Sequence, residues 1–190
     1  METQSHFSLP DAIALLARTP ATLDSLLSGL PESWTHRNEG PNTWSARDIL
    51  GHLLFVERTQ WLQRIQFLLA EGEARPFNPV NRFARLTEDR DKSLPQLLEA
   101  FAHSRSENLT TLRSLNLQPE DFARRGVHPA FGPVTLSELL ATWTIHDLNH
   151  LHQLSRVMAH QYRDEVGPWQ AYLGVLKCDG HSAACWKLAA

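Results

Sequence analysis

Two histidines four residues apart, His146 and His150, carry the clearest chemistry in this sequence. They lie in residues 135–157, TLSELLATWTIHDLNHLHQLSRV. Apolar residues recur there at steps of three and four, the periodicity of one face of a helix. Both imidazoles therefore project, one turn apart, from the face that this pattern predicts to be buried. A buried imidazole is unfavourable unless something satisfies it, and two placed in this way can bind one metal ion if a third ligand joins them.

His52 is the candidate for that third ligand, because it also interrupts the apolar face of a predicted helix. Three neutral imidazoles bind a divalent ion well and leave positions open for water or substrate. The sequence therefore predicts one divalent metal ion bound by His52, His146 and His150. Zinc and nickel are the first candidates and iron and manganese the next, since imidazoles accept several such ions.

Two neighbours of these histidines are candidates for shaping the site. Gln153 follows His150 by three residues and could hold a ligand or orient the site from a second layer. It could equally be an amide at the edge of the core, satisfied by backbone or water. Trp143 precedes His146 by three residues and could wall a substrate pocket, although tryptophan at this spacing is more often part of the core.

Charged residues beside the histidines are interpreted as structural. Asp147 follows His146 but points about a quarter-turn away on a helix, so it is expected to meet solvent or bridge to another helix. Glu57 lies five residues after His52, too far round a helix to join it easily. His152 faces another side of its helix than His150 does, and we expect it to lie outside the site.

Four helical segments are predicted to position these side chains. The first carries a break near Pro20, where a proline suits the start of a new helix. Ser/Thr-x-x-acid or amide patterns predict the starts of the others at Ser45, Ser93 and Thr135. No segment strongly predicts a strand, which favours an all-α four-helix bundle. The predicted helices span about 7–30, 45–71, 93–115 and 135–162.

The connections differ in length. Residues 73–92 are charged, contain two prolines and form a long second connection, which is uncommon unless it crosses the molecule or shapes a site. Residues 116–134 contain two glycines and three prolines and can hold a short hairpin. Gly167-Pro168 breaks the chain before a short helical segment, WQAYLGVLK.

Composition indicates one globular domain over residues 1–190, with the bundle at about 10–162 and a C-terminal extension at 163–190. The net charge of −3 gives no reason to expect nucleic acid as a partner. There is no run of eighteen apolar residues and no signal-peptide pattern at the start, so a cytoplasmic protein without a membrane partner is expected.

Cys178, His181 and Cys185 could form a partial metal site or a redox pair, but an ordinary tail is favoured.

The flanking residues give the histidines a family context. Trp44-Ser45-x-x-Asp48-Ile49-x-x-His52-Leu53-x-x-x-Glu57, followed by His146-Asp147-x-x-His150-x-x-Gln153, resembles the DinB-like family (the DinB/YfiT superfamily). The resemblance covers about residues 10–176 and includes an early TP-x-x-L-x-x-L-L segment and the Gly-Pro-Trp at 167–169. It implies that His52, His146 and His150 are the metal ligands. It also implies an up-down-down-up bundle, which suits the long connection between helices 2 and 3, and frequent homodimers.

The resemblance leaves the reaction open. It implies a thiol-dependent transferase or isomerase that uses a low-molecular-weight thiol. The first hypothesis is therefore an enzyme, either a metal-dependent hydrolase or such a thiol-dependent transferase, with a small-molecule substrate. The alternative is a non-catalytic metal-binding or stress-response protein whose metal is structural or regulatory. His146-Asp147 also suggests an HD-type phosphohydrolase, but that class needs the Asp as a ligand and a further His and Asp. A di-iron site is set aside because its Glu-x-x-His pairs are missing.

Overall fold

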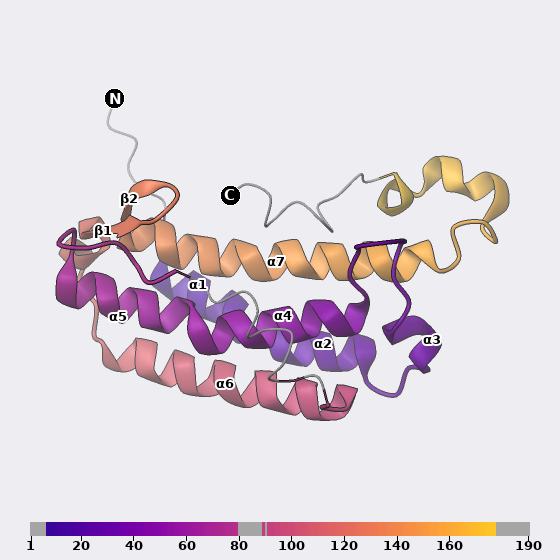
Figure 1. Cartoon of the computed structure of the whole chain (residues 1–190), viewed down its shortest axis with the longest axis horizontal. Helices are drawn as coiled ribbons and strands as arrows, with labels where there is room; N and C mark the ends of the chain where they lie inside the picture. The colour runs from indigo at the N-terminus through magenta and orange to yellow at the C-terminus, as the bar shows by residue number, and fades with distance from the viewer. Residues whose placement is uncertain (1–6, 80–88, 90, 178–190) are drawn as a thin grey trace.

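In the computed structural model, which describes residues 7–79, 89 and 91–177, four helical rods lie side by side along the long axis (Figure 1). Two rods are interrupted, and two are single helices. The prediction of a helical bundle is confirmed. The main elements are α1 (Leu9–Leu16), α2 (Thr19–Leu27), α3 (Glu32–Thr35), α4 (Ala46–Thr59), α5 (Trp61–Glu71), α6 (Leu94–Ser114), β1 (Arg125–His128), β2 (Gly132–Thr135) and α7 (Leu136–His160).

Local sequence sets where three of the long helices begin. In each case a Ser or Thr hydroxyl accepts a backbone N–H inside the helix, and the side chain three residues on accepts the N–H of the first residue. Both halves of this reciprocal cap are present, so the predicted starts are confirmed. The pairs are Ser45–Asp48 for α4, Ser93–Gln96 for α6 and Thr135–Glu138 for α7.

Both interrupted rods bend at identifiable residues. The break predicted near Pro20 is present, because α2 restarts at Thr19 with the proline in its first turn. The break between α4 and α5 was not predicted. There the Thr59 hydroxyl donates to the Phe55 carbonyl at 2.7 Å, a contact that bends helices, and Gln60 leaves helical geometry at φ −121° and ψ −62°. The prediction of one continuous helix over 45–71 is therefore wrong, because a kink at Gln60 divides it into α4 and α5.

A small antiparallel sheet corrects the all-α prediction. Strands β1 and β2 pair in register from Arg125 opposite Thr135 to His128 opposite Gly132. Gly132 has a φ of +74°, which lets the chain turn back tightly into β2. The hairpin lies within the loop that could hold one, at the end of the bundle beside α5 (Figure 1).

The C-terminal extension contains the short helical segment predicted there. It consists of two 3₁₀ helices, η3 (Gly167–Tyr172) and η4 (Gly174–Leu176). Residues 178–190 lie outside the described part of the chain, and so does the proposed Cys178, His181 and Cys185 cluster. The long second connection is only partly described, so its path stays a prediction, as does the single-domain division. No described helix is both long and apolar enough to cross a membrane.

The apolar core divides into two clusters along the bundle. One centres on α1, α5 and the first half of α7 and includes Leu16, Ile65 and Trp143. The other centres on α2, α4 and the second half of α7 and includes Leu23 and Leu154. Three buried charged side chains form a polar layer between the two clusters: Glu57, Arg105 and Asp147.

Arg105 on α6 is the centre of this polar layer and is 1% exposed. Its Nε and Nη2 donate to the two carboxylate oxygens of Glu57 on α4, at 2.9 and 2.8 Å. Its Nη1 and Nη2 donate to the two oxygens of Asp147 on α7, at 2.6 and 3.1 Å. Nη1 also reaches the carbonyl of Leu16, and the Thr19 hydroxyl donates to Asp147 at 2.6 Å. One guanidinium thus joins all four rods.

Further hydrogen bonds complete the layer around Glu57. The Trp143 indole N–H donates to Glu57 Oε2 at 3.2 Å, and the Asn108 amide donates to Oε1 at 3.0 Å. Burial by itself lowers the pKa of Arg105, but the charges and hydrogen bonds of Asp147 and Glu57 outweigh burial and raise that pKa above its usual value. Arg105 therefore stays a cation, and two carboxylates share its guanidinium.

Replacing Arg105 by Met should destabilise the protein by about 3–5 kcal/mol, because two buried carboxylates lose their counter-ion. Urea unfolding followed by far-ultraviolet circular dichroism measures the loss. Arg113→Met is the matched control: Arg113 lies on the same helix but is exposed, and its loss should change stability by no more than about 0.5 kcal/mol. Equal effects of the two substitutions would contradict a central role for Arg105.

Candidate metal centre

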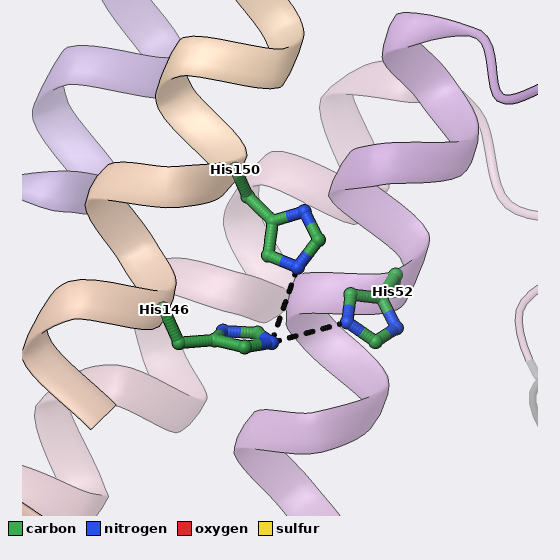
Figure 2. A group of neighbouring side chains, drawn as sticks. All are labelled: His52, His146 and His150. Atoms are coloured by element: carbon green, nitrogen blue, oxygen red, sulfur yellow. Dashed lines mark hydrogen bonds between the residues drawn. The ribbon is translucent and has the colours of Figure 1, made fainter. Parts of the chain in front are cut away.

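The three predicted histidines converge, two from α7 and one from α4 (Figure 2). The Nε2 atom of His146 lies 3.2 Å from that of His52 and 3.1 Å from that of His150. One potential ligand atom from each of the three lies within 4.8 Å of the others. His150 is 1% exposed, whereas His52 and His146 are partly exposed. The site therefore sits between the two helices with one side toward solvent.

The arrangement fits a bound metal ion better than a hydrogen-bonded cluster. Two nitrogens that each lie about 2.0–2.1 Å from a tetrahedral ion are about 3.3 Å apart, close to the separations seen here. His146 Nε2 carries either one proton or one lone pair, so it cannot make good hydrogen bonds to both neighbouring Nε2 atoms. A cation that accepts all three lone pairs removes this conflict.

Gln153 orients one of the candidate ligands. Its amide oxygen lies 2.8 Å from His150 Nδ1 and accepts a hydrogen bond from it. In neutral His150 this places the proton on Nδ1 and leaves the lone pair on Nε2, which faces the other two imidazoles. Gln153 is itself 5% exposed. The sequence left open whether Gln153 meets the site or only the core edge, and the structure places it against His150.

Burial favours the neutral form of His146. Burial lowers its pKa well below the usual value, and positive charge on His150 and Arg105 lowers it further. Its Nδ1 atom is buried and has no hydrogen-bond partner within the described residues. The ring instead packs edge-on against Trp61, with centroids 5.1 Å apart. Packing and charge thus keep this imidazole neutral, the form that binds metal.

Of the two interpretations of Trp143, pocket wall or core residue, the structure supports the core residue that the spacing favoured. Trp143 is fully buried, stacks on Trp61 with centroids 6.1 Å apart, and donates to Glu57. The indole that touches His146 is that of Trp61, which the sequence analysis did not single out. A second indole, Trp44, lies against His52 and His150, at centroid distances of 4.9 and 6.1 Å.

The charged neighbours behave as structural elements. Asp147 bridges to α6 and α2 rather than meeting solvent, and Glu57 is buried beside it. The residue that the sequence analysis missed is Arg105. A signal was present, because Arg105 stands four residues after Phe101 and four before Leu109, in the apolar stripe of α6. An arginine in such a position indicates a buried counter-ion.

Other parts of the molecule do not share the site. His152 is exposed on α7, and exposed His103 pairs with Glu107 at 3.3 Å. Two grooves, of about 610 and 550 Å³, run between α2 and α6 and around the start of α6. None of the three converging histidines lines either groove.

Comparisons with known proteins agree with the helical-bundle fold. The family model described as the DinB superfamily matches residues 15–154. Among solved structures, YfiT from Bacillus subtilis, reported as a probable metal-dependent hydrolase with an unusual four-helix bundle topology, is 21% identical. The similarity covers 87% of this chain and 92% of YfiT, with a TM-score of 0.67. At this identity the likeness establishes the fold alone. A search among curated proteins finds no match.

The lowered pKa of His146 predicts how the stability of the fold depends on pH. Unfolded histidine titrates near 6.5, so as the pH falls below about 6.5 the unfolded state takes up the proton first. Stability in the presence of a chelator should therefore decline until the pH passes the lower folded pKa. Nitrogen NMR of the imidazoles should show His146 neutral at pH 6.5, and His146→Gln should reduce the pH dependence of unfolding. A folded His146 that titrates near 6.5 would contradict this account.

Proposed function

The chain belongs to the DinB superfamily, and from this premise we propose that it binds one divalent metal ion through His52, His146 and His150 and uses it to act on a small-molecule substrate. The observation that carries the proposal is the convergence of three Nε2 atoms from two helices. Zinc or nickel is the proposed ion, because both accept imidazole ligands readily.

We propose metal-dependent hydrolysis as the reaction, with thiol-dependent group transfer as the second candidate. A divalent ion with three protein ligands can lower the pKa of a bound water or thiol and polarise a substrate oxygen. The partial exposure of His52 and His146 supports a reactive site, since a purely structural ion is normally enclosed by four protein ligands. We place hydrolysis before thiol-dependent transfer because YfiT is described as a probable metal-dependent hydrolase.

A non-catalytic role for the metal is the alternative, and one observation favours it. The grooves of about 610 and 550 Å³ both lie away from the three histidines. In that case the ion would only tie α4 to α7, and its removal would lower stability without any loss of turnover.

The assembly and topology are further proposals. In Figure 1, α1–α2 and α7 run in one direction along the bundle and α4–α5 and α6 run in the opposite direction, which supports the up-down-down-up arrangement. Ile145 and Leu148, which are 60% and 45% exposed on neighbouring turns of α7, support a homodimer.

Metal analysis tests the binding proposal. Protein purified without a metal-affinity column and then exposed to zinc should retain about one equivalent after dialysis, measured by plasma mass spectrometry. Replacing His52 or His150 by Ala should abolish retention, because two imidazoles hold the ion far less well than three. His152→Ala is the control, since His152 is exposed on the same helix, and should retain the metal.

The same proteins test the reaction. A panel of esters, amides and lactones, assayed with and without a small thiol, should reveal a turnover that His52→Ala loses and His152→Ala keeps. Turnover that persists in His52→Ala would exclude metal catalysis by these histidines. Full metal binding without turnover on any panel member, together with loss of stability on chelation, would favour the structural alternative.

Gln153→Leu should weaken zinc binding about 10–100-fold, because His150 loses the acceptor that orients its ring. Gln153→Glu keeps an acceptor oxygen and should bind zinc more tightly than the leucine variant. Competition with a chromophoric chelator gives both affinities. Identical affinities in the leucine variant and the parent protein would show that the contact between Gln153 and His150 does not orient the ligand.

A further inference from the structure

We infer that Trp44 is a specificity-determining residue: its indole walls the solvent side of the three-histidine site and favours ligands that carry a flat apolar group beside their metal-binding oxygens. The inference rests on the proposed metal site and adds to it a class of substrate. Three features of the described residues carry it: ring contacts, exposure, and the anchoring of the loop before Trp44.

The first feature is the contact of one indole with two candidate ligands. The Trp44 ring lies 4.9 Å from the His52 ring and 6.1 Å from the His150 ring, centroid to centroid. It is nearly parallel to the His150 ring, at 18°. Trp61 packs against the third imidazole, that of His146, at 5.1 Å. Two indoles thus contact the three imidazoles, one from two residues before α4 and one from the start of α5.

The second feature is exposure, which separates the two indoles. Trp61 is 6% exposed and belongs to the core, and His150 is also buried. Trp44, His52 and His146 are partly exposed. Of the two indoles, Trp44 is therefore the one that a molecule reaching the histidines from solvent can contact. Trp61 is thus a buried neighbour of the site, while Trp44 is a partly exposed one.

The third feature is a loop that holds Trp44 in place. The Thr43 hydroxyl accepts the N–H of Glu39 at 3.0 Å and donates to the Gly40 carbonyl at 2.7 Å, which closes residues 39–43 into a compact turn. Glu39 then pairs with Arg156 of α7 at 2.7 Å, and both side chains are about nine-tenths buried. This ion pair anchors the loop to the helix that carries His146 and His150. Glu39 and Arg156 are therefore positioning residues for Trp44.

The chemistry of an indole wall defines the ligand class. An aromatic ring prefers another flat apolar ring at centroid distances of about 4.5–7 Å, stacked or edge-on. None of the residues of this wall and site carries a fixed positive charge to recognise an anion. Small, highly polar ligands would gain little from Trp44, whereas an aromatic or flat unsaturated group next to the coordinating oxygens would gain a stacking partner.

A matched pair of ligands tests the inference without requiring an activity. The intact protein is loaded with cobalt(II), and its visible absorption is followed during titration with benzohydroxamate or acetohydroxamate, which differ only in a phenyl or methyl group. The ratio of the two affinities should fall about tenfold in Trp44→Ala. Trp44→Phe should keep most of the preference, and Glu39→Gln should lose part of it. Trp169→Ala is the control, because Trp169 is 70% exposed and lies on the C-terminal extension.

The outcomes separate this inference from the proposed function. If Trp44→Ala binds cobalt normally with an unchanged affinity ratio, the aromatic wall is wrong and the metal site stands. If Trp44→Ala does not bind cobalt, the titration is repeated with Trp44→Leu. An affinity ratio in Trp44→Leu equal to that of the parent protein would also overturn the inference. If the parent protein binds no cobalt, the proposed metal site fails and the inference fails with it.

Discussion

One buried guanidinium holds the four rods of this bundle in register. Arg105 makes two-pronged hydrogen bonds to Glu57 and to Asp147, and it also reaches the backbone at Leu16. Bidentate pairs of this kind fix direction as well as distance. Hydrophobic burial alone allows a helix to rotate or slide by small amounts, because it is non-directional. The polar layer removes that freedom at the level between the two apolar clusters.

The geometry of the candidate metal centre depends on this polar layer. Asp147 is the neighbour of His146 on α7, and Glu57 lies five residues beyond His52 on α4. When Arg105 fixes the two carboxylates, it also fixes the rotation of both helices about their axes. The histidines, on other sides of the same helices, are then directed toward each other (Figure 2). The layer of buried charged side chains, which costs free energy to desolvate, thus supports a site whose ligands must be placed accurately.

The three imidazoles are supported in different ways. His150 has a specific acceptor, the amide oxygen of Gln153, whereas His146 is held by burial and by the ring of Trp61. In neutral His150 this contact leaves the lone pair on Nε2, and burial lowers the pKa of His146, so that each ring can donate a lone pair to a cation. His52 is partly exposed and lies beside Trp44. The buried His150 therefore belongs to the core side of the site, whereas His52 and His146 are partly open to solvent.

The sequence by itself determined the features that depend on short-range physics: helix starts from Ser/Thr caps, the break near Pro20, and two histidines on one face of α7. It also supplied His52, through apolar periodicity and a family pattern. Only the tertiary structure decided which side chains meet across helices. Arg105 as the centre of the polar layer, Trp61 in place of Trp143 beside His146, and the kink at Gln60 all depend on long-range packing. Periodicity gives the face that a residue occupies, but the partner on that face depends on how neighbouring helices rotate and stagger.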